Sequence, residues 1–207
     1  MLEIIDCEQN SADWFEVRRG IVTASNFATV MAKGKGNAKS VTRQKYMYQL
    51  AGEIITGEPA ETFTSADMER GHVMEGKAAD YYQFMTGTEA QVVGFIRNGP
   101  KGASPDRLVG SDGLLEIKTN KPSVLIERIL RDDIPPEHVA QIQGQIWVAE
   151  REWCDLCCYW PNMMPFIKRA YRDDNYIATL EKEVARFNDE LAELVEKLKS
   201  YGRRAAA

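Results

Sequence analysis

The stretch SPDRLVGSDGLLEIKTNKP, residues 104–122, places charged side chains inside an apolar run. Leu115 and Ile117 have the character of a buried strand, but Glu116 and Lys118 interrupt it. Because alternate side chains of a strand share a face, Glu116 and Lys118 point the same way, with Cα atoms roughly 6.6 Å apart. Burying both without partners would be expensive. The pair could lie on a solvated face, form a structural ion pair, or stand in a cleft where a cation and a reacting anion offset the cost.

Asp106 adds a second carboxylate close to this strand. It follows Pro105 and leads into the preceding predicted strand, and Ser-Asp-Gly at 111–113 predicts a tight turn between the two strands. The resulting hairpin could bring Asp106 to Glu116, where two carboxylates repel unless something positive lies between them. A hard divalent cation such as Mg²⁺ fits, because it prefers oxygen ligands. An ammonium group nearby can orient and help deprotonate a water. This pattern favours metal-assisted attack of water on a phosphodiester.

The elements that position these residues are predicted from hydrophobic periodicity, caps and turn residues. Helices are predicted over residues 11–18, 25–33, 40–56, 65–86, 122–131, 136–150 and 174–200. Strands are predicted over residues 91–97, 107–110, 114–119, 153–160 and 166–172. This order predicts an α/β (α+β) fold with a central mixed β-sheet flanked by helices. We expect one domain over 1–207, with a frayed tail at 201–207.

The amino-acid composition limits the classes of protein to which this chain could belong. With 44% hydrophobic and 28% charged residues, the chain is expected to be soluble and globular, and no segment predicts a membrane span or a signal peptide. We therefore expect a cytoplasmic protein with reduced cysteines, and zinc is disfavoured because the Cys154-to-Cys157 pair has no second pair at zinc spacing. The net charge of −5 argues only weakly against a nucleic-acid substrate. A basic loop at 33–39 could follow a phosphate backbone.

Four blocks of sequence together resemble a known family. SPD at 104–106 with LEIK at 115–118 resembles the core motif of the PD-(D/E)xK nucleases. RRGIVTAS, RGHVMEGKAADYYQFMTG and VAQIQGQIWV resemble further motifs of the phage lambda exonuclease family, also called YqaJ-type viral recombinases. The order and spacing of the blocks fit over roughly residues 10–175. The resemblance implies a restriction-endonuclease-like core.

The resemblance also implies a metal site and a catalytic lysine. The implied metal ligands are the carboxylates of Glu75, Asp106 and Glu116 and the backbone carbonyl of Ile117. Lys118 corresponds to the lysine beside the attacking water. The implied cofactor is Mg²⁺, as one or two ions, with Mn²⁺ as a substitute. From the residues alone, Glu75 would be read as an exposed glutamate of a long helix.

Further roles follow for polar residues outside the hairpin. Gln141 corresponds to a residue that orients the water or the lysine, although Gln143 and Gln145 compete with it and Gln145 shares its helix face. The implied 5′-phosphate site consists of Arg18, with Arg19 as the alternative, and Ser25, which is also a predicted helix N-cap.

The resemblance implies a Mg²⁺-dependent 5′-to-3′ exonuclease that degrades one strand of double-stranded DNA from its ends. It would release mononucleotides and leave 3′ overhangs for a single-strand annealing recombinase, and it would act as a homotrimeric ring around DNA. One alternative is a PD-(D/E)xK endonuclease of restriction or repair type. Another is a catalytically silent DNA-binding protein. An apolar stripe on the last helix could dock on the domain or on another subunit; it comprises Ile177, Leu180, Val184, Phe187, Leu191, Leu194 and Leu198.

Overall fold

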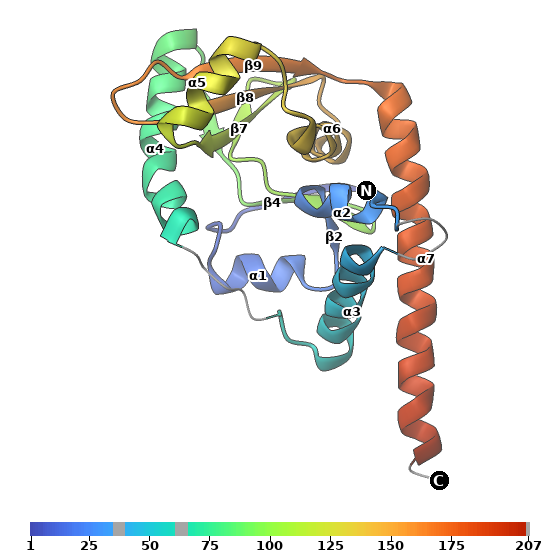
Figure 1. Cartoon of the computed structure of the whole chain (residues 1–207). Helices are drawn as coiled ribbons and strands as arrows, with labels where there is room; N and C mark the ends of the chain where they lie inside the picture. Colours follow the sequence, from blue (N-terminus) through green and yellow to red (C-terminus); the bar gives the residue numbers. More distant parts are fainter. Residues whose placement is uncertain (35–39, 61–65, 206–207) are drawn as a thin grey trace.

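The computed structural model describes residues 1–34, 40–60 and 66–205 of the 207-residue chain, without the side chains of residues 66–69, 72 and 202–205. Most of the predicted basic loop, residues 35–39, therefore lies outside the described residues. Figure 1 shows a layer of strands with helices on both sides and one long helix along the edge of the molecule.

The described helices largely match the predicted ones. They are α1 (Ala12–Arg18), the 3₁₀ helix η1 (Ala24–Asn26), α2 (Phe27–Met31), α3 (Val41–Thr56), α4 (Ala66–Thr86), α5 (Pro122–Arg131), α6 (Pro136–Ala149) and α7 (Asp174–Ala205). The Ser11 hydroxyl caps α1 by accepting a hydrogen bond from the Trp14 N–H. Pro122 and Pro136 occupy first-turn positions of α5 and α6, where a missing N–H costs nothing.

The strands form two sheets. The first has the order β1 (Leu2–Ile5), β4 (Phe95–Asn98), β5 (Lys101–Ala103), β2 (Val22–Thr23). The second has the order β3 (Ala90–Val92), β6 (Arg107–Val109), β7 (Gly113–Thr119), β8 (Trp153–Tyr159), β9 (Phe166–Tyr171). In the second sheet β7 and β8 are parallel and the other pairs are antiparallel, so the predicted central mixed sheet is confirmed.

The four-stranded sheet was not predicted, and it divides one predicted strand. The segment expected as a strand over 91–97 breaks at Gly94, so that β3 and β4 enter different sheets. A Cβ at Gly94 would lie 2.4 Å from the carbonyl oxygen of Cys7, so glycine permits the chain after β1 to pass this close. β5 is too short, and too rich in small residues, to show a strand period in the sequence.

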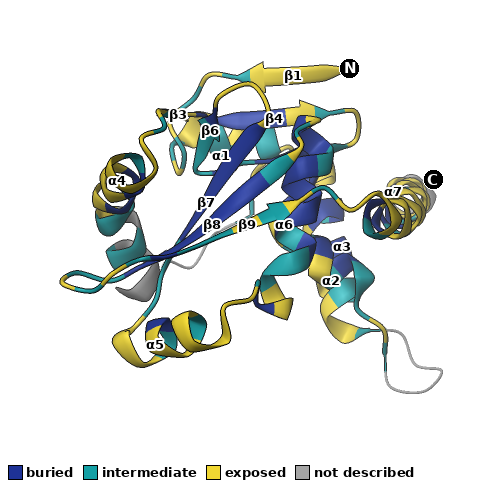
Figure 2. Ribbon diagram, turned by 90° about the horizontal axis from the view of Figure 1, so that it is seen from above, coloured by how far each residue is buried: buried dark blue, intermediate teal, exposed yellow. Residues whose placement is uncertain are grey.

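The central strand β7 separates two hydrophobic layers, as its alternation predicted. Leu114 and Leu115 are each 0% exposed but belong to different layers, Leu114 to the larger one with α6 and α7 and Leu115 to the smaller one with α4. Figure 2 shows β7 and β8 as buried strands between α4 and α6. Full burial of each leucine stabilises the fold by about 1.5–3 kcal/mol. This packing fixes which way Glu116 and Lys118 face.

The apolar stripe of α7 docks on its own chain. α7 packs against α2, α3 and α6, and the stripe is buried from Ile177 to Leu191, with Val195 buried beyond it. Leu198, predicted to belong to the stripe, is 44% exposed, because α7 continues past the rest of the molecule (Figure 1). The helix ends at Ala205, five residues beyond its predicted end at residue 200, and the frayed tail over 201–207 stays a prediction.

The four cysteines are free thiols, and the three on β8 are buried. In the described part of the chain, no helix combines the length and the hydrophobicity that crossing a bilayer requires.

Candidate functional site

The β6–β7 hairpin brings Asp106 to the charged strand. β6 and β7 pair antiparallel around the predicted Ser-Asp-Gly turn, with Arg107 opposite Leu115. Oδ2 of Asp106 accepts a hydrogen bond of 2.5 Å from the backbone N–H of Ile117, the residue after Glu116. Burial raises the pKa of Asp106 well above its usual range, and the negative charges of Glu116 and Glu75 raise it further. The predicted convergence of Asp106 and Glu116 is therefore present in the structure.

Glu116 is surrounded by donors. Its side chain is almost fully buried, and Oε1 accepts hydrogen bonds of 2.6 Å from Nζ of Lys118 and from Nε2 of Gln141. Oε2 accepts one of 2.6 Å from Nε2 of Gln145. Burial lowers the pKa of Lys118, but the carboxylate of Glu116 outweighs burial, so the pKa is raised and the amine stays charged. The three donors together offset the cost of a buried carboxylate.

The helix α6 supplies two glutamines to the site, and a third points elsewhere. Gln141 and Gln145 lie one turn apart on the face toward Glu116, as i and i+4 positions do. Gln143 donates to the Tyr171 carbonyl at 2.8 Å and accepts from the Asp173 N–H at 2.9 Å, so it joins α6 to the start of α7. The sequence analysis selected Gln141 and left Gln145 as a competitor, whereas in the structure both side chains donate to the carboxylate of Glu116.

Glu75 lies on α4 and faces an arginine that sequence reasoning missed. Its Oε1 accepts a hydrogen bond of 2.6 Å from Nη1 of Arg107, the residue after Asp106. Among the residues that the structure describes, no group of three or more Asp, Glu, His or Cys side chains is gathered as a metal site. The carboxylate of Glu75 is engaged in the ion pair with Arg107. Its role as a metal ligand therefore stays a prediction.

The chemistry of the donors nevertheless suits a hard cation. Asp106 and Glu116 offer carboxylate oxygens, and the pKa of Asp106 is raised first by burial and then by the negative charges of Glu116 and Glu75, which a bound cation would offset. Mg²⁺ is commonly held by one or two carboxylates together with water and substrate phosphate. Asp106 and Glu116 therefore fit such an ion.

Asp106→Asn is expected to stabilise the protein in the presence of a chelator. The folded pKa of Asp106 lies above the value of about 3.9 for an unfolded aspartate, so the stabilising neutral form is lost as the pH rises through the folded pKa. Asparagine keeps an acceptor for the Ile117 N–H without the charge. Urea unfolding at pH 4 to 8 should show an advantage for the variant that grows with pH. An advantage that is the same at every pH would contradict the charge argument.

A cavity of about 850 Å³ connects this cluster to α1 and α3. Asp106, Glu75 and Lys118 line it together with Arg18 from α1. Figure 1 shows α1 and α3 on the side of the molecule away from α5, with the lower end of α4 above α1. The cavity thus brings together residues from the beginning and the middle of the chain.

Arg18 is held inside this cavity by neutral groups. Its Nη1 donates to Oγ of Ser104 at 3.0 Å, and its guanidinium lies 3.8 Å from the ring centre of Trp14. Burial lowers the pKa of Arg18 to about 10, so it remains charged at neutral pH. The alternative, Arg19, also lines the cavity, but it forms an ion pair of 2.6 Å with the carboxylate of Glu16, whereas no such pair with a described residue occupies Arg18. This placement favours Arg18 as the anion-binding residue.

Ser104 is a further residue that sequence reasoning missed. Its Oγ accepts hydrogen bonds from Arg18 and, at 2.9 Å, from Nε1 of Trp14. It stands two residues before Asp106, so it joins the arginine to the carboxylate cluster. Its place in the quoted Ser-Pro-Asp motif was the available signal, although serine is too common for that motif to mark a role.

Ser25 is placed differently from the expectation. It lies within η1, whose N-cap is Thr23, and α2 begins after Asn26, so the predicted N-cap role is wrong. Ser25 is exposed, its hydroxyl is 3.2 Å from that of Thr23, and Thr23 and Asn26 line the cavity while Ser25 does not. A phosphate contact by Ser25 remains a prediction.

Comparison with known proteins identifies a family and similar solved structures. Residues 13–152 match the model of the YqaJ-like viral recombinase domain. An alkaline exonuclease, LHK-Exo, from Laribacter hongkongensis is 35% identical with a TM-score of 0.84, over 94% of this chain and 100% of that chain. The structure of LHK-Exo in complex with dAMP gives 36% identity and a TM-score of 0.85 over the same shares.

A more distant structure shows the same fold. A phage-related exonuclease from Haemophilus somnus 129PT is 13% identical with a TM-score of 0.66, over 86% of this chain and 96% of that chain. No curated protein sequence matches. The family match, together with the coverage and identity of the Laribacter structures, shows that this chain belongs to the YqaJ-like viral recombinase family.

Proposed function

We propose that this protein is a metal-dependent nuclease that degrades one strand of double-stranded DNA from its 5′ end. The observation that carries the proposal is the shared cavity in which Asp106 and Lys118 lie with Arg18. Membership of the family and the likeness to alkaline exonucleases support it. The dAMP bound by LHK-Exo supports a mononucleotide as the product.

Each side chain has a defined task in this proposal. Asp106 and Glu116 would hold Mg²⁺, with Glu75 and the Ile117 carbonyl as further ligands; the bound ion would supply charge stabilisation at the reacting phosphate. Lys118, as a charged ammonium, orients the attacking water and stabilises the negative charge that develops on it. Gln141 and Gln145 fix the orientation of the Glu116 carboxylate by donating to its two oxygens.

The arginine favours an exonuclease over an endonuclease. Arg18 lies in the cavity against a hydroxyl and aromatic rings, and a guanidinium in such a place can form charge-assisted hydrogen bonds with a terminal phosphate. An enzyme that cuts within a duplex has no terminal phosphate to hold. The cavity therefore suits an enzyme that starts from phosphorylated ends.

The deciding experiment compares linear duplexes with 5′-phosphate or 5′-hydroxyl ends and a closed circle, each with Mg²⁺ or with chelator. We expect Mg²⁺-dependent release of mononucleotides from the phosphorylated 5′ end while the circle stays intact. Cutting of the circle would indicate an endonuclease, and absence of cleavage would indicate a DNA-binding protein.

Arg18→Gln is expected to reduce the preference for phosphorylated over hydroxyl ends by about tenfold or more, the worth of a hydrogen bond to a charged group. Gln keeps a polar side chain but removes the charge and the guanidinium geometry. The ratio of kcat/KM for the two end types measures the effect. Arg186→Gln, on the exposed face of α7, is the matched control. An unchanged ratio in Arg18→Gln would refute its role.

Family membership also leads us to infer a homotrimeric ring, cytoplasmic location and transfer of the 3′ overhang to a single-strand annealing recombinase. A ring would explain how a chain of net charge −5 stays on DNA. Light scattering coupled to size-exclusion chromatography tests the ring directly, since it distinguishes a trimer from a monomer.

A further inference from the structure

The segment between Arg18 and Thr23, which joins α1 to β2, is held at two points by side chains of α3. Oε2 of Glu53 accepts a hydrogen bond of 2.7 Å from the backbone N–H of Gly20. The hydroxyl of Tyr46 accepts one of 3.2 Å from the backbone N–H of Thr23. Because Tyr46 and Glu53 lie two turns apart on one helix, they set the spacing of the two backbone sites they hold.

The same segment fits closely against α3 between these points. Gly20 has a φ of +69°, and a Cβ there would lie 2.5 Å from Cγ1 of Ile54. Oε1 of Glu53 accepts a further hydrogen bond of 3.0 Å from Nε2 of Gln49, which fixes the carboxylate. Glu53 and Tyr46 are 7% and 8% exposed, so neither interaction is loosened by bulk solvent.

Glu53 and Tyr46 also line the cavity that contains Arg18. Hydrophobic packing does not require Glu53, because a buried carboxylate costs free energy unless its hydrogen bonds offset that cost. Tyr46 contributes its ring to the core, but packing does not require its hydroxyl. The arrangement makes sense if the backbone beside Arg18 must be held at a fixed distance from the carboxylate cluster. A misplacement of about 1 Å is enough to lower rates by about a hundredfold in a positioned site.

We propose that Glu53 and Tyr46 are positioning residues that hold the segment from Arg18 to Thr23 in the geometry that binds the 5′-terminal phosphate. The inference rests on the proposed function, since it concerns the same phosphate. Neither side chain is assigned to contact the DNA. Their effect reaches the substrate through the position of the segment, because the N–H groups of Gly20 and Thr23 donate to Glu53 and Tyr46.

The test uses Glu53→Ala and Glu53→Gln with duplexes that carry 5′-phosphate or 5′-hydroxyl ends. Glu53→Ala should lower the preference for phosphate by about tenfold, since it removes a hydrogen bond to a charged acceptor, and should lower the rate on hydroxyl ends to a smaller extent. Glu53→Gln keeps an acceptor for the Gly20 N–H and should retain the preference. An unchanged ratio in Glu53→Ala, or an equal loss in both variants, would overturn the proposal.

Tyr46→Phe provides an independent test that preserves the ring, which packs 5.6 Å from the ring of Phe187. It should lower the preference for phosphate by roughly threefold to tenfold, the worth of a neutral hydrogen bond. Tyr48→Phe, at an exposed position of the same helix, is the matched control. If Glu53→Ala does not fold, Tyr46→Phe alone tests the proposal. An unchanged ratio of the rates on phosphate and hydroxyl ends in Tyr46→Phe would then overturn it.

The two proposals fail in different ways. If the wild-type protein shows no preference for phosphorylated ends, the proposed 5′-phosphate site itself is refuted. If the wild type shows the preference and Arg18→Gln loses it, but the Glu53 and Tyr46 variants keep it, only the positioning role is refuted. Thermal unfolding of every variant identifies any loss that comes from a damaged fold.

Discussion

Lys118→Met is expected to reduce mononucleotide release by about 10²- to 10³-fold, the usual effect of removing one preorganised donor that stabilises developing negative charge. The Lys118 ammonium lies 2.6 Å from Glu116 and lines the cavity, so it is placed to act on a water near the carboxylates. Methionine keeps most of the length of the side chain and removes the charge. Glu116 retains its hydrogen bonds from Gln141 and Gln145, so the fold should survive.

Single-turnover release of nucleotide from a phosphorylated duplex measures this effect separately from DNA binding. The variant should still bind the end, because Arg18 is unchanged. Lys182→Met, at an exposed position on α7, is the control and should behave like the wild type. If Lys118→Met kept wild-type rates, the hydrolytic mechanism proposed for this cluster would be wrong, and its lysine would be a structural ion-pair partner.

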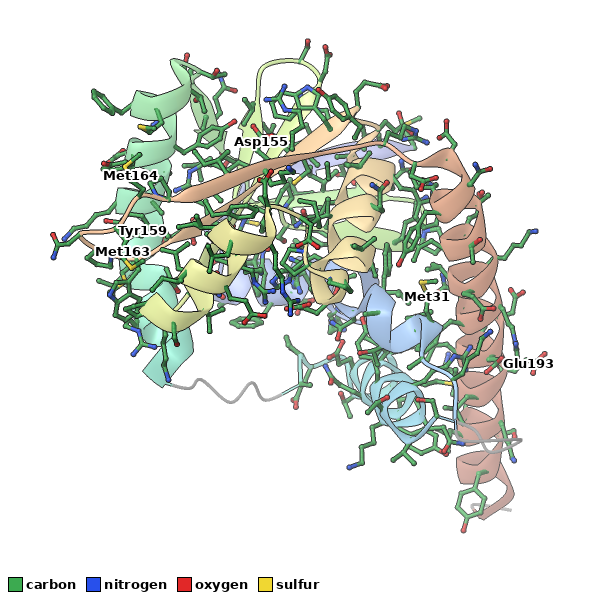
Figure 3. The ribbon with its side chains drawn as sticks, turned by 45° about the horizontal axis from the view of Figure 1, so that its top comes forward. Met31, Asp155, Tyr159, Met163, Met164 and Glu193 are labelled. Carbon is green, nitrogen blue, oxygen red and sulfur yellow. The ribbon has the colours of Figure 1, made fainter. Side chains whose placement is uncertain are left out.

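Asp155→Ala is expected to lower the free energy of unfolding by about 3 kcal/mol, the cost of breaking a buried charge pair. Asp155 lies on β8, where Figure 3 labels it. It is 2% exposed, and its carboxylate accepts two hydrogen bonds from Arg169, of 2.8 and 2.9 Å, and one of 2.7 Å from the hydroxyl of Tyr82. The variant would leave the buried Tyr82 hydroxyl without this acceptor.

The loss should appear as a fall in Tm of about 6–12 °C for a chain of this size. Arg169 is partly exposed, so water can compensate it, which places the effect at the lower end of the range for buried pairs. Asp189→Ala on the exposed face of α7 is the control. Because Tyr82 lies two turns beyond Glu75 on α4, the variant should also weaken the position of Glu75. Equal Tm values for the two variants would contradict the assigned role of Asp155.

Much of the geometry of the β6–β7 hairpin could be predicted from the local sequence. The two-residue period of a strand placed Glu116 and Lys118 on one face, and the Ser-Asp-Gly turn brought Asp106 to them. The i, i+4 spacing of Gln141 and Gln145 indicated that both could face the same target. These features depend on backbone geometry over a few residues, and sequence encodes such geometry directly.

Tertiary structure decided the partner of each polar group. The carboxylate of Glu75 accepts a hydrogen bond from Arg107, which lies 32 positions away along the chain. The backbone N–H of Gly20 donates to the carboxylate of Glu53, which lies 33 positions away. The division of one predicted strand at Gly94 likewise depends on a close approach by Cys7. No local period or cap specifies such pairings, because they depend on how distant elements pack and on which buried charge needs a partner. The sequence by itself determined which carboxylates and which ammonium group the hairpin carries. The packing of the whole chain determined the cavity that Asp106 and Lys118 line together with Arg18.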